Sequence, residues 1–214
     1  MSAENNQSNK VVEDKSTYKL KGEINFKKEL EVNKIFADPN LIAQHRDRLS
    51  KGIKNITPQI LDFEIVQVVI KDNLFSTAMN EIVQYFDFSI DNDYLNFIKD
   101  NLKKSLGGQN VPEDTLNMIA DKIVKKGIVF KHLTKHWNVE VTDDEVKGML
   151  DVYYQRTNES IRDVLQDKEK FESIRQAILE EKLILKTISA FPIRFNLINP
   201  TFESSQPIDG NKKN

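Results

Sequence analysis

Cysteine is absent from the 214-residue sequence, and glycine and proline are scarce. Without cysteine the chain has no disulfide, no thiolate nucleophile and no cysteine-ligated zinc or iron–sulfur site. The seven glycines and six prolines are about half of the roughly 12% that these two residue types contribute to an average protein. Because β-sheet proteins need glycine in hairpin turns and bulges, this shortage indicates long helices. The composition therefore predicts an all-α fold.

Neither a strong excess of one charge nor a long apolar run is present. The 31 basic and 33 acidic residues nearly cancel, and the formal net charge of -2 lacks the electrostatic footprint of a nucleic-acid-binding protein. Residues 1–21 lack the apolar run of about 7–15 residues that a secretory signal needs. The most apolar stretch, residues 60–70, is interrupted by Asp62 and Glu64 and falls short of the roughly 18 apolar residues of a membrane span. We expect a cytoplasmic protein that binds neither nucleic acid nor a membrane.

Composition and hydrophobic periodicity divide the chain into four expected segments. The first is polar and is expected to be disordered, the second has short elements, the third is a helical body, and the last is mostly irregular. These segments are residues 1–16, 17–56, 57–190 and 191–214. In the last one, the apolar side chains of Phe191, Phe195, Leu197 and Phe202 can hold part of the tail in place.

Local signals indicate where the elements begin and end. Thr57-Pro58 is a strong helix start, with a capping hydroxyl followed by a proline at the first helical position. Thr142 and Glu145 have the spacing of a capping box, and Gly107-Gly108 is suited to end a helix. The predicted elements are a short strand or extended lead-in at 17–26 and helices at 27–36, 39–49, 58–85, 89–106, 112–137, 142–156, 159–165 and 169–189.

Residue types that perform catalysis or bind cofactors do not form a convincing site. His132 and His136 lie four residues apart, as two metal ligands on one helix face would, but they lack the glutamate of an HExxH motif and a third ligand. Cations near a helix C-terminus are a simpler explanation for them. Gly107-Gly108 is not followed by the Lys-Ser/Thr of a phosphate loop. We expect no enzyme, no metal and no cofactor, with the histidine pair as the best site if the protein were an enzyme.

Apolar and aromatic side chains are plentiful in comparison, with 12 Phe, five Tyr and four Met. Such stripes usually form the core of a protein. Amphipathic helices with wide apolar faces can also leave a surplus of apolar surface that binds segments of other proteins. Methionine and aromatic side chains suit such a surface because they repack around varied shapes.

Residues 145–189 carry a resemblance to a known family. Val146-Lys147-Gly148-Met149 follows an acidic capped helix start, and Arg175 precedes Leu179-Glu180-Glu181-Lys182 in the last long helix. In this pattern the chain resembles the C-terminal chaperone domain of trigger factor, a ribosome-associated bacterial folding helper. The resemblance extends over residues 110–193, and Ile56 to Leu61 is weakly similar to the opening of that domain.

The resemblance implies an elongated helical bundle with protruding arms, similar to a cradle, that binds unfolded or partly folded polypeptides without ATP. The helical part of the periplasmic chaperone that carries parvulin domains is also similar. The glycine-rich ribosome-docking signature is absent, and the chain has no room for the family's N-terminal domain or its prolyl isomerase domain, so neither activity is implied. The alternative is a helical assembly protein with one dedicated partner, and self-association through the cradle is a further option.

The residues expected to contact clients are apolar and lie where the resemblance places an arm or where aromatic residues cluster. Their alternative role, burial in the core, remains open at this point. They are Met149, Tyr153, Tyr154, Ile161, Leu165, Phe75, Met79, Phe86, Phe88 and Tyr94.

Overall fold

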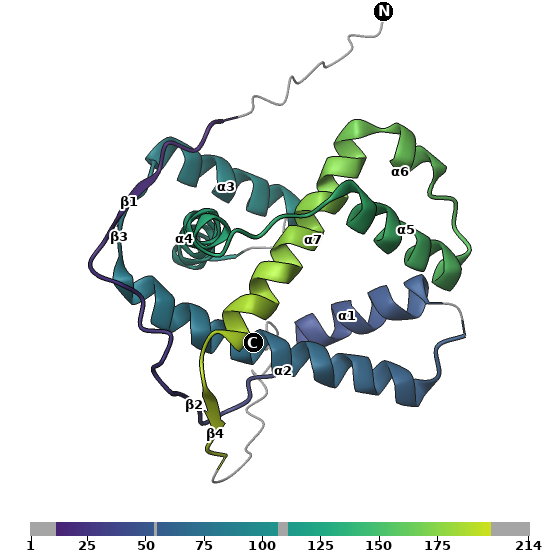
Figure 1. Cartoon of the computed structure of the whole chain (residues 1–214), viewed down its shortest axis with the longest axis horizontal. Helices are drawn as coiled ribbons and strands as arrows, with labels where there is room; N and C mark the ends of the chain where they lie inside the picture. Colours follow the sequence, from purple (N-terminus) through teal and green to yellow (C-terminus); the bar gives the residue numbers. More distant parts are fainter. Residues whose placement is uncertain (1–11, 54, 107–110, 198–214) are drawn as a thin grey trace, which may run out of the picture. The chain divides into compact units, whose positions relative to one another are not determined.

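The structure is a computed structural model that describes residues 12–53, 55–106 and 111–197. These residues contain seven α-helices and four strands of three or four residues, which confirms the all-α fold (Figure 1). The helices are α1 (Pro39–Gly52), α2 (Pro58–Ile82), α3 (Asn92–Ser105), α4 (Glu113–His136), α5 (Asp143–Thr157), α6 (Arg162–Gln166) and α7 (Lys168–Ser189). The strands are β1 (Thr17–Leu20), β2 (Leu30–Val32), β3 (Phe86–Ser89) and β4 (Ile193–Phe195), and a single 3₁₀ turn, η1 (Val83–Tyr85), follows α2.

Helix starts in the structure follow the local signals in the sequence. The Thr57 hydroxyl accepts a hydrogen bond from the backbone N–H of Ile60, and Asp38 and Asp167 cap α1 and α7 in the same way. Thr142 and Glu145 form the expected capping box at the start of α5. Side-chain oxygens at these positions satisfy backbone N–H groups that have no partner within the helix.

The predicted helix at residues 27–36 is wrong. This stretch contains a turn followed by β2, in which Leu30 and Val32 are both buried. Residues two apart share one face of a strand but lie about 200° apart around a helix, so only the extended form buries both. The partner that makes this form favourable is β4, which pairs with β2 in parallel.

Two further strands were not predicted. The apolar stripe of the predicted helix at 58–85 continues to Phe86, and the next predicted helix starts at Ser89. Both residues belong to β3. Strand β3 pairs antiparallel with β1, with Tyr18 opposite Phe88. Strand β4 lies within the segment expected to be irregular. Strand pairs join residues far apart in sequence, so local patterns carry little information about them.

The chain forms two compact units, each made from two separate stretches of sequence. The first unit comprises the described residues of 1–24 and 82–132. In it, β1 and β3 pair, and α4 supplies most of the core. The buried side chains of this unit include Ile82, Phe86, Leu116, Ala120, Val124, Ile128 and Val129.

Residues 12–16, expected to be part of a disordered tail, make specific contacts in the first unit. The backbone N–H of Asp91 donates to the Ser16 hydroxyl at 3.0 Å, and Lys15 N donates to the Asp91 carboxylate at 3.3 Å. The Lys131 ammonium pairs with the Asp14 carboxylate at 3.0 Å. The remainder of that tail (1–11), the Gly107-Gly108 helix stop and residues 198–214 with Phe202 lie outside the described residues.

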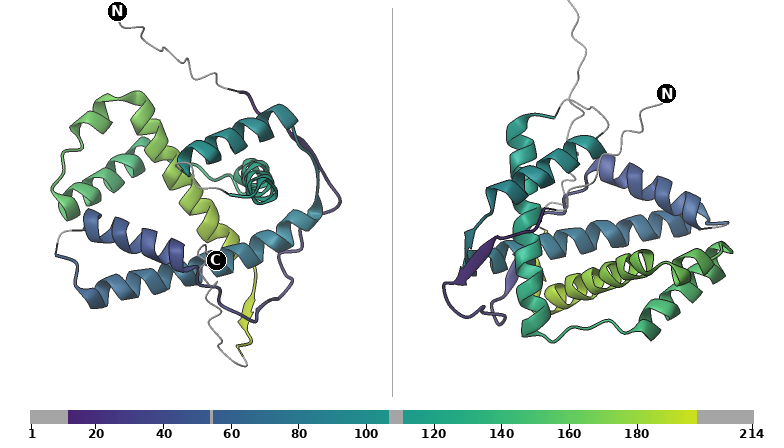
Figure 2. Two further views of the ribbon diagram at one scale, coloured as in Figure 1. Left: turned by 180° about the vertical axis from the view of Figure 1, so that it is seen from behind. Right: turned by 90° about the horizontal axis from the view of Figure 1, so that it is seen from above.

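The second unit comprises residues 25–81 and the described residues of 133–214. Its framework is formed by α2 and α7, which are joined by the ion pair of Lys71 with Glu181 at 2.9 Å. From that point the two helices diverge, and α2 carries α1 as a hairpin partner while α7 carries α5 and α6 (Figures 1 and 2). The buried side chains of this unit include Leu61, Ile65, Ala78, Met79, Leu133, Val146, Leu150, Leu183 and Phe191.

Among the described residues, no helix has both the length and the apolar character that crossing a bilayer requires.

Candidate functional site

The base of α5 is held by a row of cations on α7, which we call the α7 clasp: Arg175, Lys182 and Lys186. Seven and four residues separate them, so they share one face of the helix. The Arg175 guanidinium donates to the carbonyl oxygen of Val141 at 2.6 Å and to the Asp143 carboxylate at 2.5 Å. Together the three cations bind the connection between α4 and α5, which has no regular structure of its own.

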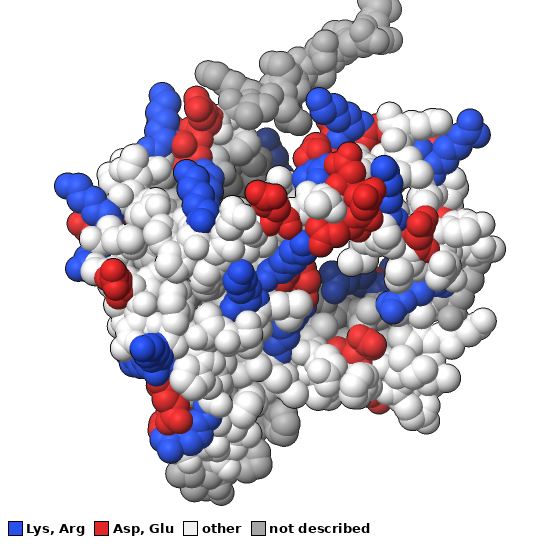
Figure 3. Space-filling view, viewed as in Figure 1, with Lys and Arg blue, Asp and Glu red and all other residues white. Residues whose placement is uncertain are grey.

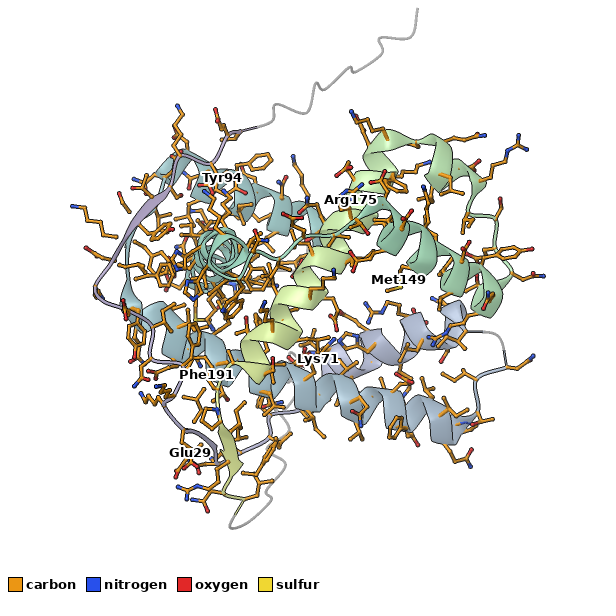
Figure 4. The ribbon with its side chains drawn as sticks, in the orientation of Figure 1. Glu29, Lys71, Tyr94, Met149, Arg175 and Phe191 are labelled. Carbon is orange, nitrogen blue, oxygen red and sulfur yellow. The ribbon has the colours of Figure 1, made fainter. Side chains whose placement is uncertain are left out.

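The other two members of the α7 clasp bind the same connection. The Lys182 ammonium donates to the carbonyl oxygen of Glu140 at 2.8 Å and pairs with the Glu145 carboxylate. Lys186 donates to the carbonyl oxygen of Trp137 at 3.3 Å and lies 5.7 Å above the centre of the Trp137 ring. Acidic and basic side chains accordingly lie next to one another where α5 and α7 meet (Figure 3), with Arg175 between the two helices (Figure 4).

These contacts lower the pKa values of the two acids at the start of α5. Hydrogen bonding and charge attraction from Arg175 lower the pKa of Asp143. The hydrogen bond from Lys182 and that from the Thr142 backbone lower the pKa of Glu145. Both carboxylates are therefore ionised at neutral pH, and they fix the first turn of α5 to α7.

Helix α5 has a buried apolar stripe with exposed apolar side chains on both sides of it. Val146 and Leu150 are buried, and they lie on the side that packs against α7. Met149 is 52% exposed and Tyr154 47% exposed, and Val152 and Tyr153 are exposed with them. Met149 lies on the side of α5 that faces α1 in Figure 4. Four large apolar side chains thus remain in contact with solvent beside the buried stripe. Met149, Val152 and Tyr153 lie on one side of the stripe, and Tyr154 lies on the other, about 140° around the helix from Met149.

The surface continues onto α6 in part. Leu165 is exposed, and Ile161, which precedes α6, is half-buried. The Tyr153 hydroxyl donates a hydrogen bond to the Glu159 carboxylate across the turn that joins α5 to α6. This hydrogen bond raises the pKa of Tyr153. Tyr153 therefore has a structural role in the turn, whereas Tyr154 is the tyrosine of the pair with no such bond described.

Of the ten residues expected to contact clients, four are exposed on α5 and α6, Ile161 is half-buried just before α6, and the other five lie on α2, β3 and α3. Met79 and Phe86 are 8% and 2% exposed, so they belong to the cores of their units and are removed from the set. Phe75, Phe88 and Tyr94 are half-buried. Phe88 stacks on Phe86 with ring centres 5.4 Å apart, and this contact explains its burial.

A second exposed apolar surface, on the hairpin of α1 and α2, was not expected from the sequence. Ile60, Phe63 and Val66 recur every third residue on α2, and Phe63 is 60% exposed. The spacing was visible in the sequence, but it is the same spacing that core residues of a helix show. Only the arrangement of α1, α7 and β2 around α2 decides which side is covered. Figure 3 shows the surface hollowed between the region of α5 and α6 and the region of this hairpin.

One protein family matches most of this chain. Residues 41–189 match the family model of the bacterial trigger factor protein C-terminus. The chain belongs to this trigger factor C-terminal family. The match begins within α1 and ends with α7, so it contains α2, α5 and α6 in full. It confirms the resemblance seen in residues 145–189.

Relatives of this trigger factor C-terminal family member occur in mycoplasmas. It is 47% identical over 183 residues to the uncharacterized MG377 homolog of Mycoplasma pneumoniae, covering 86% of this chain and 94% of that protein. The uncharacterized protein MG377 of Mycoplasma genitalium is 46% identical over the same length and coverage. The crystal structure of the hypothetical Mycoplasma protein MPN555 is 46% identical, covers 86% of this chain and 93% of that chain, and superposes with a TM-score of 0.80.

Two histidines of this family member, His132 and His136, lie in aromatic clusters. The Tyr18 hydroxyl lies 3.0 Å from Nδ1 of His132, and the His132 ring meets the Phe86 ring edge-on. His136 stacks on Phe26 with ring centres 5.9 Å apart. Within residues 12–53, 55–106 and 111–197, no group of three or more His, Cys, Asp or Glu side chains is placed to hold a metal ion. His132 is thus part of the packing of the first unit rather than a simple surface histidine.

Proposed function

We propose that this protein is an ATP-independent, holdase-type chaperone that acts in the cytoplasm and binds unfolded or partly folded polypeptides. The observation that carries the proposal is the set of exposed apolar side chains on α5 and α6: Met149, Val152, Tyr153, Tyr154 and Leu165. Several large apolar side chains exposed close together in the chain are typical of surfaces that bind other proteins. Membership of the trigger factor C-terminal family supports a non-catalytic, chaperone-type role.

The strength expected of such binding suits a chaperone that releases its clients without nucleotide hydrolysis. Full burial of one large apolar side chain contributes about 1.5–3 kcal/mol. Side chains that are already about half-buried gain less, and association has its own entropic cost. Contact with α5 alone is therefore weak, and a client that also touches Ile60, Phe63 and Val66 on α2 gains affinity by binding at two places at once.

The test is suppression of aggregation measured by light scattering with several unrelated, chemically denatured proteins. The wild-type chain is expected to slow aggregation of all of them. A Met149→Ser, Tyr154→Ser double variant removes two exposed side chains of α5 and should lose most of this effect at equal folded stability. Gln155→Ser is the matched control, because Gln155 is exposed on the same helix and is polar.

Two results would contradict the proposal. The first is a wild-type chain that protects none of the denatured proteins but co-purifies with one partner in a fixed ratio, which would favour the dedicated assembly protein. The second is a double variant that remains folded and suppresses aggregation as well as Gln155→Ser does. In that case the face of α5 is not the binding surface.

A further inference from the structure

A pocket of about 280 Å³ lies between the start of α1 and the middle of α2, entirely within the second unit. Its apolar lining includes Phe36, Leu41, Val68 and Val69, and its polar lining includes Asp72. An apolar cavity of about 150 Å³ is large enough to bind benzene, so this pocket has room for a phenyl ring. Phe36 and Leu41 are 54% and 48% exposed although they line it.

The C-terminal strand β4 pairs with β2, the strand that comes directly before the pocket in the chain. Strands β2 and β4 run in the same direction, with Val32 opposite Phe195. The backbone N–H of Asn196 donates to the carbonyl oxygen of Val32 at 3.0 Å, which extends the pairing by one residue. The residues after Leu197 therefore follow a strand that ends next to Val32, and Val32 is four residues before Phe36 in the pocket lining.

The chain length after β4 is sufficient to reach the pocket. Phe36 is four residues beyond Val32, a distance of at most about 14 Å, and adjacent strands are about 5 Å apart. Phe202 is seven residues beyond Phe195 and can span about 24 Å when extended. Residues 198–214 contain one aromatic side chain, Phe202, flanked by polar residues on its C-terminal side.

We propose that the segment 198–214 of this chain binds in its own α1–α2 pocket, with the Phe202 side chain between Leu41 and Val69. Intramolecular attachment makes this binding favourable even if the segment has low intrinsic affinity, because a short flexible linker gives an effective concentration in the millimolar range. A segment with a millimolar dissociation constant then fills the pocket about half of the time or more. The docked segment covers Phe36 and Leu41.

The absence of cysteine makes a direct test possible in the full-length chain. Leu41→Cys places a thiol in the pocket, and its rate of reaction with an aromatic disulfide reagent reports access. The rate should rise about two- to fourfold when Phe202→Ala is added, because an occupancy of one half or more protects the thiol by about this factor. The exposed Phe63→Cys, which does not line the pocket, should react at the same rate with and without Phe202→Ala.

Three outcomes would overturn the proposal. Equal rates for Leu41→Cys with and without Phe202→Ala mean that Phe202 does not cover the pocket. A rise caused by Ile208→Ala in place of Phe202→Ala assigns the pocket to another part of the chain. Protection that disappears on dilution means that the segment of a second copy fills the pocket, since intramolecular docking is independent of concentration.

Docking of the segment has a regulatory consequence that rests on the proposed function. If clients also use the hairpin of α1 and α2, the segment competes with them, and Phe202→Ala should raise client affinity about two- to fourfold, which is the inverse of the free fraction of the pocket. The two assays fail independently. Thiol access reports the docking alone, whereas aggregation suppression by the wild-type chain reports the chaperone function alone.

Discussion

Two neighbouring residues of α5 provide the sharpest test of which face of this helix is open. Leu150 is 5% exposed and packs toward α7, whereas Met149, one position earlier, is 52% exposed. Adjacent helical residues point about 100° apart, so the two side chains experience different surroundings on the same helix. Substitution of each by alanine separates a packing role from a binding role without changing the helix propensity very much.

The magnitudes follow from burial. Leu→Ala substitutions in cores cost about 2–5 kcal/mol, from lost transfer energy and from the cavity that remains. Leu150 is covered mainly by a single helix, so its surroundings can relax, and we expect the lower end, about 2–3 kcal/mol. Met149→Ala should change stability by no more than about 0.5 kcal/mol, as for surface positions generally.

Hydrogen exchange of the α5 amides is the appropriate measurement, because this arm can open without unfolding of the whole chain. Leu150→Ala should accelerate exchange of these amides by roughly 30- to 150-fold, since about 1.4 kcal/mol corresponds to a factor of ten. Met149→Ala should leave it nearly unchanged. Equal losses of protection in the two variants, or a larger loss in Met149→Ala, would refute the assignment of the faces and with it the proposed client surface.

Two further predictions concern the base of the same helix. Thr142→Ala should destabilise α5 by about 1 kcal/mol, because the Glu145 N–H loses its side-chain partner. Gln155→Ala, at an exposed position of the same helix outside the capping box, is the comparison, and an unchanged α5 exchange rate in Thr142→Ala would contradict the capping role. Acid should loosen the α7 clasp. The folded pKa values of Asp143 and Glu145 are lowered, so their pairing stabilises the fold above the unfolded pKa of about 4, and this stabilisation is lost as the pH falls through the lower folded values. Trp137 lies under Lys186, so its fluorescence should report a transition in this acidic range. The amplitude of the transition should be smaller in an Arg175→Gln, Lys182→Gln double variant. An identical transition in that variant would exclude the α7 clasp as its cause.

The proposed chaperone function and the proposed pocket occupancy depend on different surfaces of the second unit. The exposed side chains of α5 and α6 carry the proposed client binding, and the α1–α2 pocket carries the proposed docking of the C-terminal segment. The α7 clasp belongs to neither surface. Its role is to hold the first turn of α5 in place, so that Met149 and Tyr154 are presented on a fixed helix.

Seven of the eight helices predicted from the sequence are present in the described residues, and the exception is the one at 27–36. The start of α2 at Thr57-Pro58, the capping box of Thr142 with Glu145 and the extent of α7 are all local features, because a helix satisfies its backbone hydrogen bonds within one stretch of chain. The family resemblance was likewise readable in residues 145–189, which lie within the matched region.

Tertiary structure alone decided the strands and the division between core and surface. Leu30 and Val32 became a strand because a segment more than 160 residues later, Ile193–Phe195, pairs with them. Met79 and Met149 both lie within predicted helices, yet one is 8% and the other 52% exposed. Periodicity reveals that a helix has an apolar face, but whether another helix covers that face depends on contacts between distant parts of the chain.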